Sequence, residues 1–165
     1  MARPRFVVEV AGPAGSGKST VSRWLTQRSQ VVAASIWGLP RPLYAASAVR
    51  VLPAIGALVG AARWLPWEET EQLIRLDAIV LLDGADPLLV ERLRSRAKAH
   101  PLKQSSDEEL YEFAAAYRRA FEWVIAGMTA GGRAPKVVAL ESNGAPPEEL
   151  AEQVLAACQE TVHAD

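Results

Sequence analysis

Near the start of the chain, glycines, a lysine and a hydroxyl follow one another in the spacing G-x-x-x-x-G-K-S. Glycines let backbone N–H groups approach an anion with no side chain between them, and the start of a helix adds unpaired N–H groups. Lys18 supplies a positive charge for outer phosphates, and the Ser19 hydroxyl is a ligand for Mg²⁺. The alternative is a glycine-rich turn that binds nothing. The spacing favours a site for the phosphates of a nucleotide, formed by Gly12, Pro13, Ala14, Gly15, Ser16, Gly17, Lys18, Ser19 and Thr20.

Asp83 is a second residue whose type and position in the sequence suggest a chemical role. It ends the apolar run "AIVLLD". An acid at the end of a buried strand can orient Mg²⁺ through water, so Asp83 is a candidate metal residue with a catalytic role. The alternative is an aspartate that only shapes a turn, and both interpretations stay open. Glu141, which follows the run "KVVAL", is a weaker candidate of the same kind.

These residues need a strand before the glycines and a helix after them. Residues 6–11 form an apolar run apart from Glu9, which predicts a central parallel strand with Glu9 and Ala11 on one side. Residues 18–28 predict a helix whose Val21 and Leu25 face inward. The context of the motif is therefore the one that a phosphate site requires.

The rest of the chain continues this alternation of strands and helices. Ser106 with Glu109 is a capping box for a long helix, whose apolar stripe includes Tyr117. Alternating strands and helices predict an α/β fold with a parallel sheet flanked by helices on both sides. We expect one domain over residues 1–165. The other expected strands are 31–37, 78–83 and 136–140, and the other expected helices are 45–64, 67–76, 87–98, one after Ser106 with the stripe Leu110, Tyr117, Phe121, Val124 and Met128, and a last one with Leu150, Val154 and Cys158 facing inward.

Composition excludes some classes of function. The chain has 165 residues, 50% of them apolar and 22% charged, and a formal net charge of -1, which argues against nucleic acid as a partner. A single cysteine and no recognisable signal peptide fit the cytoplasm. The apolar stretch 43–62 is interrupted by Arg50 and Pro53, which favours a buried helix over a membrane span. Both histidines, His100 and His163, are isolated and lack metal-ligand spacing.

Three longer segments resemble known kinases. "VVEVAGPAGSGKSTVSRWL" resembles the opening of small nucleoside and nucleotide monophosphate kinases, with loop wording close to that of cytidylate kinases. "DAIVLLDGADPLLVERLRSRAK" and "KVVALESNGAPPEELAEQVLAA" are more similar to thymidylate kinases. The resemblance covers about residues 5–30 and 77–160. It implies the three-layer sandwich of P-loop NTPases, with room for a reduced strand count. It also implies transfer of the γ-phosphoryl group of ATP, with Mg²⁺, to a nucleoside monophosphate or similar small acceptor.

The resemblance also implies roles for residues outside the glycine motif. Ser142 and Asn143 would line the adenine side of ATP; otherwise they form a plain turn. Residues 92–106 would form a lid, in which Arg94 and Arg96 would contact phosphates as catalytic cations. At helical spacing Arg96 shares a face with Arg92, and Arg94 shares one with Lys98. The alternative is a solvated basic helix end, favoured by the helix dipole.

Departures from the kinase pattern keep other functions open. Ala11 stands where relatives carry an acid, and no Asp is followed by Arg anywhere in the chain. Arg41 and Arg50 are the candidates for gripping an acceptor phosphate. The alternatives are an ATP-binding protein without kinase activity and a P-loop ATPase switch; no Asn-Lys-x-Asp signature supports a GTPase. An uncovered apolar stretch at 45–64 would favour a homodimer.

Overall fold

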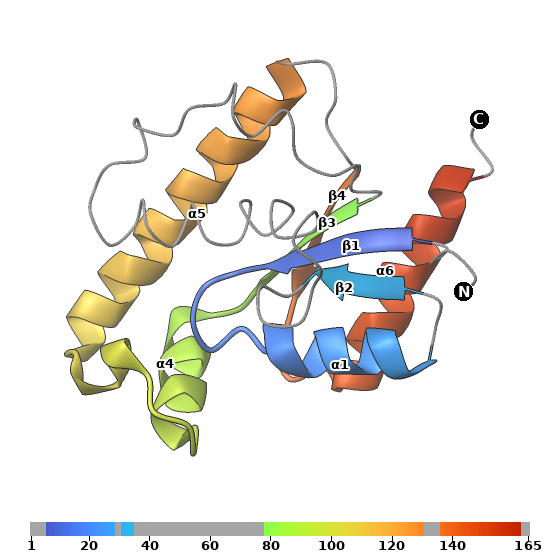
Figure 1. Cartoon of the computed structure of the whole chain (residues 1–165). Helices are drawn as coiled ribbons and strands as arrows, with labels where there is room; N and C mark the ends of the chain where they lie inside the picture. Colours follow the sequence, from blue (N-terminus) through green and yellow to red (C-terminus); the bar gives the residue numbers. More distant parts are fainter. Residues whose placement is uncertain (1–5, 29–30, 35–77, 131–135, 163–165) are drawn as a thin grey trace.

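The computed structural model describes residues 6–28, 31–34, 78–130 and 136–162 (Figure 1). The expected loop at 38–42, the helices at 45–64 and 67–76, and the end of the strand at 31–37 lie outside these residues. So do Arg41 and Arg50, and with them the stretch expected to favour a homodimer. The described elements are β1 (Phe6–Ala11), α1 (Lys18–Arg28), β2 (Val31–Ala34), β3 (Ala78–Asp83), α4 (Asp86–Ser95), the 3₁₀ helix η3 (Pro101–Gln104), α5 (Asp107–Ala130), β4 (Lys136–Glu141) and α6 (Pro147–Val162).

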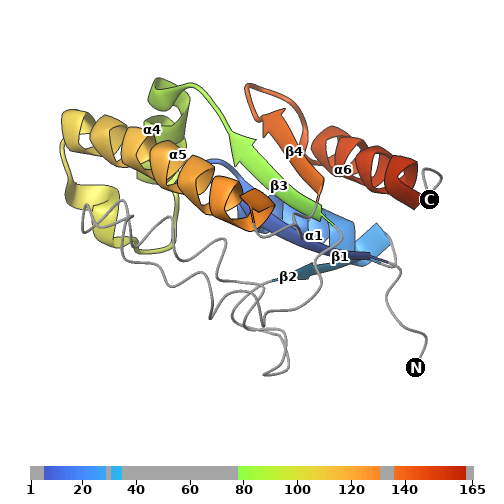
Figure 2. The same ribbon diagram turned by 90° about the horizontal axis from the view of Figure 1, so that it is seen from above.

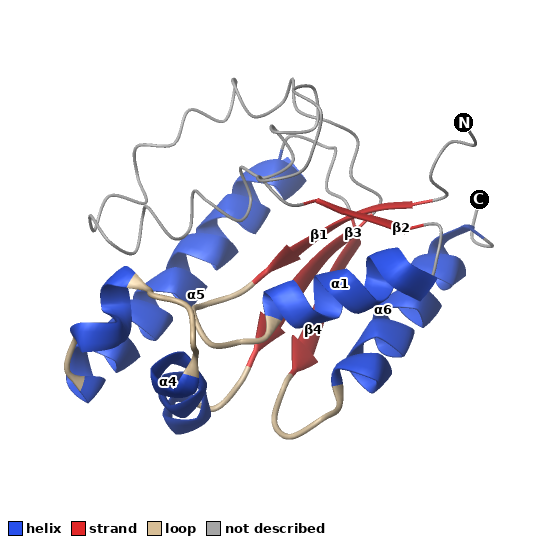
Figure 3. Cartoon of the chain, turned by 60° about the horizontal axis from the view of Figure 1, so that its bottom comes forward, coloured by secondary structure: helices blue, strands red, loops and turns tan. Residues whose placement is uncertain are grey.

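The strands form a parallel sheet in the order β2-β1-β3-β4. In the register, Ala11 lies opposite Leu81, and Asp83 lies opposite Glu141. Because all strands run the same way, the loops that follow β1, β3 and β4 meet at one edge, next to α4 (Figure 3). Ser142 N donates to the Asp83 carbonyl across this edge, at 2.7 Å. The edge is the expected place for ligands in an open α/β sheet.

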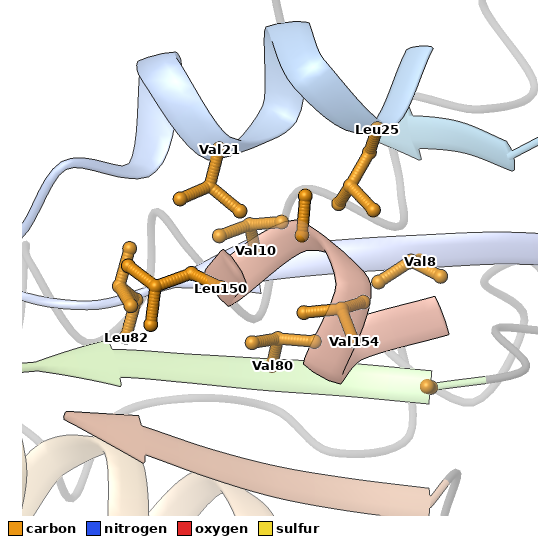
Figure 4. Packing of buried hydrophobic residues seen from close by; sticks show 10 residues of the cluster. Val8, Val10, Val21, Leu25, Val80, Leu82, Leu150 and Val154 are labelled. Carbon is orange, nitrogen blue, oxygen red and sulfur yellow. The ribbon is translucent and has the colours of Figure 1, made fainter. Parts of the chain in front are cut away.

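Helices cover both faces of the sheet (Figure 2). Alternate residues of β1 and β3 pack against α1 and α6; Val10 and Val80 lie in this layer and are fully buried (Figure 4). The opposite face of the same strands packs against α5, where Ala11 and Ile79 meet Phe121. The prediction of an α/β fold with a parallel sheet covered on both sides is therefore confirmed.

One helix ends earlier than its sequence predicts. We expected a helix over 87–98, but α4 ends at Ser95, and Arg96 has extended backbone (φ -62°, ψ 128°). The expected sharing of helix faces by Arg92 with Arg96, and by Arg94 with Lys98, is therefore wrong. Pro101, which begins η3, cannot donate a backbone hydrogen bond and favours a new turn over continuation of the helix.

The capping box of α5 is confirmed. Ser106 N donates to a Glu109 carboxylate oxygen at 2.8 Å, and Glu109 N donates to the Ser106 hydroxyl at 3.2 Å. The predicted apolar stripe of this helix is buried at Leu110, Tyr117, Phe121 and Val124. In α6, Leu150 and Val154 are buried as predicted; the side chains of Met128 and Cys158 lie outside the described residues.

None of the described helices is both long enough and apolar enough to span a bilayer. The stretch 43–62, which the sequence predicts to be a buried helix, lies outside the described residues. The longest described helix, α5, has a polar and charged side beside its buried stripe.

Candidate functional site

The backbone of the glycine loop, residues 12–19, takes a shape that needs glycine. Gly12, Gly15 and Gly17 have φ values of 147°, 89° and 93°, in the region that other residues rarely adopt. A Cβ on Gly12 would lie 2.0 Å from the Leu82 carbonyl oxygen, and one on Gly15 would lie 2.2 Å from the Leu89 carbonyl oxygen. The glycines thus let the loop lie directly on the backbones of β3 and α4.

The glycine loop presents backbone N–H groups that donate to no described residue of the protein. Within the described part of the chain, no hydrogen bond to protein is donated by the N–H groups of Gly15, Gly17 or Ser19. Gly17 and Ser19 are exposed, and α1 begins at Lys18, so the positive end of its dipole adds to the field of these donors. The loop can therefore bind an anion through its backbone.

The Lys18 side chain folds back over the glycine loop. Its ammonium donates to the Pro13 carbonyl oxygen at 2.6 Å and lies 3.4 Å from the Ser16 hydroxyl oxygen. Ser16 is fully buried, whereas Lys18 is partly exposed. The positive charge of Lys18 is therefore held against the loop, at the Pro13 carbonyl oxygen.

Tyr117 on α5 fixes the first residue of the loop. Its hydroxyl accepts the backbone N–H of Gly12 at 3.0 Å, in a buried position. Sequence reasoning placed Tyr117 only in the apolar stripe of the helix and missed this contact. The signal was present, because a tyrosine among buried apolar residues needs a partner for its hydroxyl.

Asp83 is held by an arginine that the sequence analysis did not single out. Arg118 Nε donates to one Asp83 carboxylate oxygen at 2.6 Å, and Arg118 Nη2 donates to the other at 3.0 Å. The same Nη2 also lies 2.6 Å from an Asp86 carboxylate oxygen. Hydrogen bonding to Asp83 raises the pKa of Arg118 above its usual value. Gly84 N donates to the Asp83 carboxylate as well, at 2.8 Å, as expected of an aspartate that shapes a turn.

The turn after β4 lies at the same edge of the sheet, bonded to the β3–α4 turn. Arg92 on α4 donates to the Ser142 hydroxyl at 2.9 Å and to the Ser142 carbonyl at 2.8 Å. The Asn143 side-chain oxygen accepts from Ala85 N at 2.9 Å, and its amide nitrogen donates to Glu141 at 2.9 Å. The polar groups of Ser142 and Asn143 thus join elements, and their role toward adenine stays a prediction.

Arg94 and Arg96 have different surroundings. Arg94 donates to the carbonyl oxygens of Lys103 and Ser105 and to Asp107 at 2.9 Å, so it fastens η3 and the start of α5 to α4. Arg96 is exposed. Contact of either residue with phosphates stays a prediction, but the geometry of Arg94 favours a positioning role.

The sequence suggested that His100 is isolated, but the structure gives it a hydrogen-bond partner. Its Nδ1 accepts the N–H of Leu102 at 3.2 Å, at the start of η3. Burial lowers the pKa of His100, and the positive charges of Arg96 and Lys18 lower it further. The position of His100 in the sequence reveals neither this hydrogen bond nor these charge effects.

The glycine loop is suited to binding a phosphate chain. The described acidic residues are less suited to binding a metal ion on their own. The described residues contain no cluster of three or more His, Cys, Asp or Glu side chains able to hold a metal ion. Ser19 is exposed at the start of α1, so its hydroxyl is accessible to a phosphate-bound Mg²⁺. Both carboxylate oxygens of Asp83 already accept from Arg118. A metal role for Ser19 fits the geometry, and one for Asp83 requires sharing its carboxylate with Arg118.

A scan against models of known protein families finds no family that matches this chain, and a search of curated proteins finds no match. The class that the fold itself defines is an α/β protein with a parallel sheet and helices on both faces. Any function must therefore be argued from the residues at the sheet edge.

Proposed function

We propose that the chain binds Mg²⁺-ATP through its glycine loop and transfers the terminal phosphoryl group to a nucleoside monophosphate or similar small acceptor. The observation that carries the proposal is the Lys18 ammonium held against the loop, 2.6 Å from the Pro13 carbonyl oxygen, in a loop whose Gly15 and Gly17 N–H groups donate to no described residue. A lysine in this place exchanges a weak carbonyl partner for phosphate oxygens when the nucleotide binds.

The chain supplies positioning and charge in this reaction. Backbone N–H groups and the α1 dipole hold the phosphate chain, and Lys18 neutralises charge that develops on the outer phosphates. The Ser19 hydroxyl would hold Mg²⁺, which neutralises phosphate oxygens when bound. Arg96 is an exposed cation that directly follows the last residue of α4, and Arg94 keeps that segment in place.

The same proposal includes the fold and the domain organisation. We propose that the chain folds as a P-loop NTPase sandwich and that it forms a single domain. They are supported by the parallel sheet, by the glycine loop between β1 and α1, and by the turns after β3 and β4 at the same edge. Ser142 and Asn143 would then lie on the adenine side, held there by Arg92 and Ala85. A cytoplasmic location follows from this chemistry, because ATP is available there.

A second candidate is an ATP-binding protein that transfers nothing. It is favoured by Asp83, whose carboxylate is occupied by Arg118, and by Ala11, which stands at the end of β1 where a carboxylate would reach the loop. Glu9 lies on the same face of β1 as Ala11 but two residues before it, and Glu9 is fully buried. A P-loop ATPase switch is the third possibility.

The proposal is tested by measuring ADP formation from Mg²⁺-ATP with each member of a panel of nucleosides and nucleoside monophosphates. We expect one acceptor class to raise ADP formation above the rate without acceptor, and Lys18→Ala to abolish the increase. ATP binding with no acceptor-dependent ADP would replace the proposal by the second candidate. Slow hydrolysis that no acceptor changes would favour the ATPase switch.

A further inference from the structure

A cleft lies between the glycine loop and the helices α4 and α5. It holds about 250 Å³ of empty space, part of which is open to solvent. Its walls include Pro13 and Ala14 of the loop, Leu89 and Val90 of α4, and Phe113 of α5. Apolar side chains and an aromatic ring are suited to packing against the flat face of a base. The cleft is therefore a candidate site for a small organic molecule.

Asp86, the first residue of α4, is the one charged residue among the described residues that line the cleft. Its Oδ1 accepts from Arg118 Nη2 at 2.6 Å, which holds the carboxylate in place. Its Oδ2 accepts from no described residue, and the side chain is 33% exposed. A carboxylate oxygen held in this way at an apolar cleft is suited to accepting a hydrogen bond from a hydroxyl of a ligand.

The charge at the Asp86 end of the cleft is negative. Arg118 pairs with Asp83 as well as with Asp86, so two carboxylates share one guanidinium and one negative charge is left over. A phosphate group placed beside Asp86 would meet this charge, whereas an uncharged hydroxyl would donate to it. This end of the cleft therefore selects against a phosphorylated ligand.

The cleft and the proposed phosphate site have Pro13 in common. Pro13 lines the cleft, and its carbonyl oxygen accepts from Lys18 Nζ at 2.6 Å. A molecule in the cleft would therefore lie beside the cation that is proposed to hold the outer phosphates of ATP. An acceptor has to lie there, because phosphoryl transfer requires the reacting atoms to approach within about 3–3.5 Å.

We propose that the cleft binds the acceptor, and that the acceptor is a nucleoside without a phosphate, one of whose hydroxyls donates to Asp86 Oδ2. A nucleoside combines a flat base for the apolar walls with sugar hydroxyls for the carboxylate. The inference rests on the proposed phosphoryl transfer and narrows its acceptor class to uncharged nucleosides. Asp86 is in this account a specificity-determining residue.

The transfer itself uses a second hydroxyl of the nucleoside. Its oxygen forms a bond to the γ-phosphorus of ATP, and the bond between that phosphorus and the β–γ bridging oxygen breaks. ADP leaves with the electron pair of the broken bond, and the proton of the hydroxyl passes to solvent. The products are a nucleoside monophosphate and ADP.

The test uses the full chain with Mg²⁺-ATP and compares each nucleoside with its own 5′-monophosphate. ADP formation over a range of acceptor concentrations gives KM and kcat/KM for each. Asp86→Asn keeps one oxygen for Arg118 and removes the charge. Glu91→Gln, which changes an exposed acid of α4 outside the cleft lining, is the matched control. Calorimetric titration of Mg²⁺-ATP into both variants shows whether they keep the glycine loop intact.

We expect at least one nucleoside to be preferred over its monophosphate by about tenfold or more in kcat/KM. In Asp86→Asn the KM for that nucleoside should rise about tenfold, and the preference should shrink, because both the acceptor of the hydroxyl and the repelling charge are lost. A merely structural role of Asp86 would weaken activity with both acceptors alike. Glu91→Gln should behave as wild type.

Two results overturn this inference while leaving phosphoryl transfer intact. One is a monophosphate accepted as well as its nucleoside by wild type. The other is a preference that is the same in Asp86→Asn as in Glu91→Gln. Failure of every acceptor to raise ADP formation would instead remove the proposed function, and with it the acceptor role of the cleft.

Discussion

The hydroxyl of Tyr117 on α5 accepts the backbone N–H of Gly12 at 3.0 Å, across 105 residues of sequence. The helix that covers one face of the sheet therefore also fixes the first residue of the glycine loop. Arg118, the next residue of the helix, holds Asp83 at the end of β3. Through two adjacent side chains, α5 organises both of the neighbouring strand ends from which the candidate site is built.

Tyr117→Phe tests the first of these contacts. The substitution leaves the buried Gly12 N–H without the Tyr117 hydroxyl, and we expect the free energy of unfolding to fall by about 1–3 kcal/mol. Urea unfolding measures the change. Tyr111→Phe is the control on the same helix, with an expected effect within about 0.5 kcal/mol. Equal effects of the two substitutions would show that the contact contributes nothing.

Alanine substitutions test the shape of the glycine loop. Gly12→Ala places a Cβ 2.0 Å from the Leu82 carbonyl oxygen at a φ of 147°, so the loop must move. We expect a loss of more than about 2 kcal/mol in the free energy of unfolding. Gly144→Ala is the control, because Gly144 also has positive φ (80°) but nothing lies within 4 Å of its Cβ position. Gly144→Ala should lower the free energy of unfolding by about 1 kcal/mol. If the Gly12→Ala protein is no less stable than this control, the described shape of the loop is wrong.

A double-mutant cycle tests the ion pair between Asp83 and Arg118. Both side chains are mostly buried, at 22% and 29% exposure, and the contact is bidentate. We expect a coupling energy of about 1 kcal/mol between Asp83→Asn and Arg118→Ala, measured by urea unfolding. The more exposed pair Arg94–Asp107 should give less than about 0.5 kcal/mol. A coupling no larger at Asp83 than at Asp107 would contradict the organising role of Arg118.

The pH dependence of stability reports on His100. Its pKa is lower in the folded chain than the ordinary 6.5, so the folded state binds fewer protons in this range than the unfolded state. The contribution of His100 to the free energy of unfolding is present above pH 6.5 and is lost as the pH falls through the folded-state pKa. Between pH 7.5 and 5.5, wild type should therefore lose more unfolding free energy than His100→Gln. His163→Gln should behave as wild type, and an equal loss in His100→Gln would contradict the described environment of His100.

Local sequence predicts more of the fold than of the candidate site. The bounds of β1, α1 and β3 follow from dense apolar runs and from glycines at their ends, which are local signals. The end of α4 was missed because Lys98 continues the helical charge pattern, although the backbone turns away at Arg96. Capping at Ser106 was predictable, since both partners lie within one turn of helix.

The site contacts that were missed all join residues far apart in the chain. Tyr117 and Arg118 reach Gly12 and Asp83 only because the parallel sheet brings β1 and β3 under α5. A hydrophobic stripe predicts which face of α5 is buried, but it does not say which polar atom lies beneath a tyrosine hydroxyl. His100 was read as isolated for the same reason, since Lys18 is distant in sequence. Lys18 itself was predictable because the loop motif is contiguous.

The central claim, that the glycine loop binds the phosphates of Mg²⁺-ATP through Lys18, is tested most directly by calorimetric titration of Mg²⁺-ATP into wild type and Lys18→Ala. Arg23→Ala, which removes an exposed charge from the same helix, is the matched control. We predict that wild type and Arg23→Ala bind with similar affinity, and that Lys18→Ala binds at least about tenfold more weakly, equivalent to about 1.4 kcal/mol. No binding by wild type, or the same affinity in Lys18→Ala, would contradict the claim.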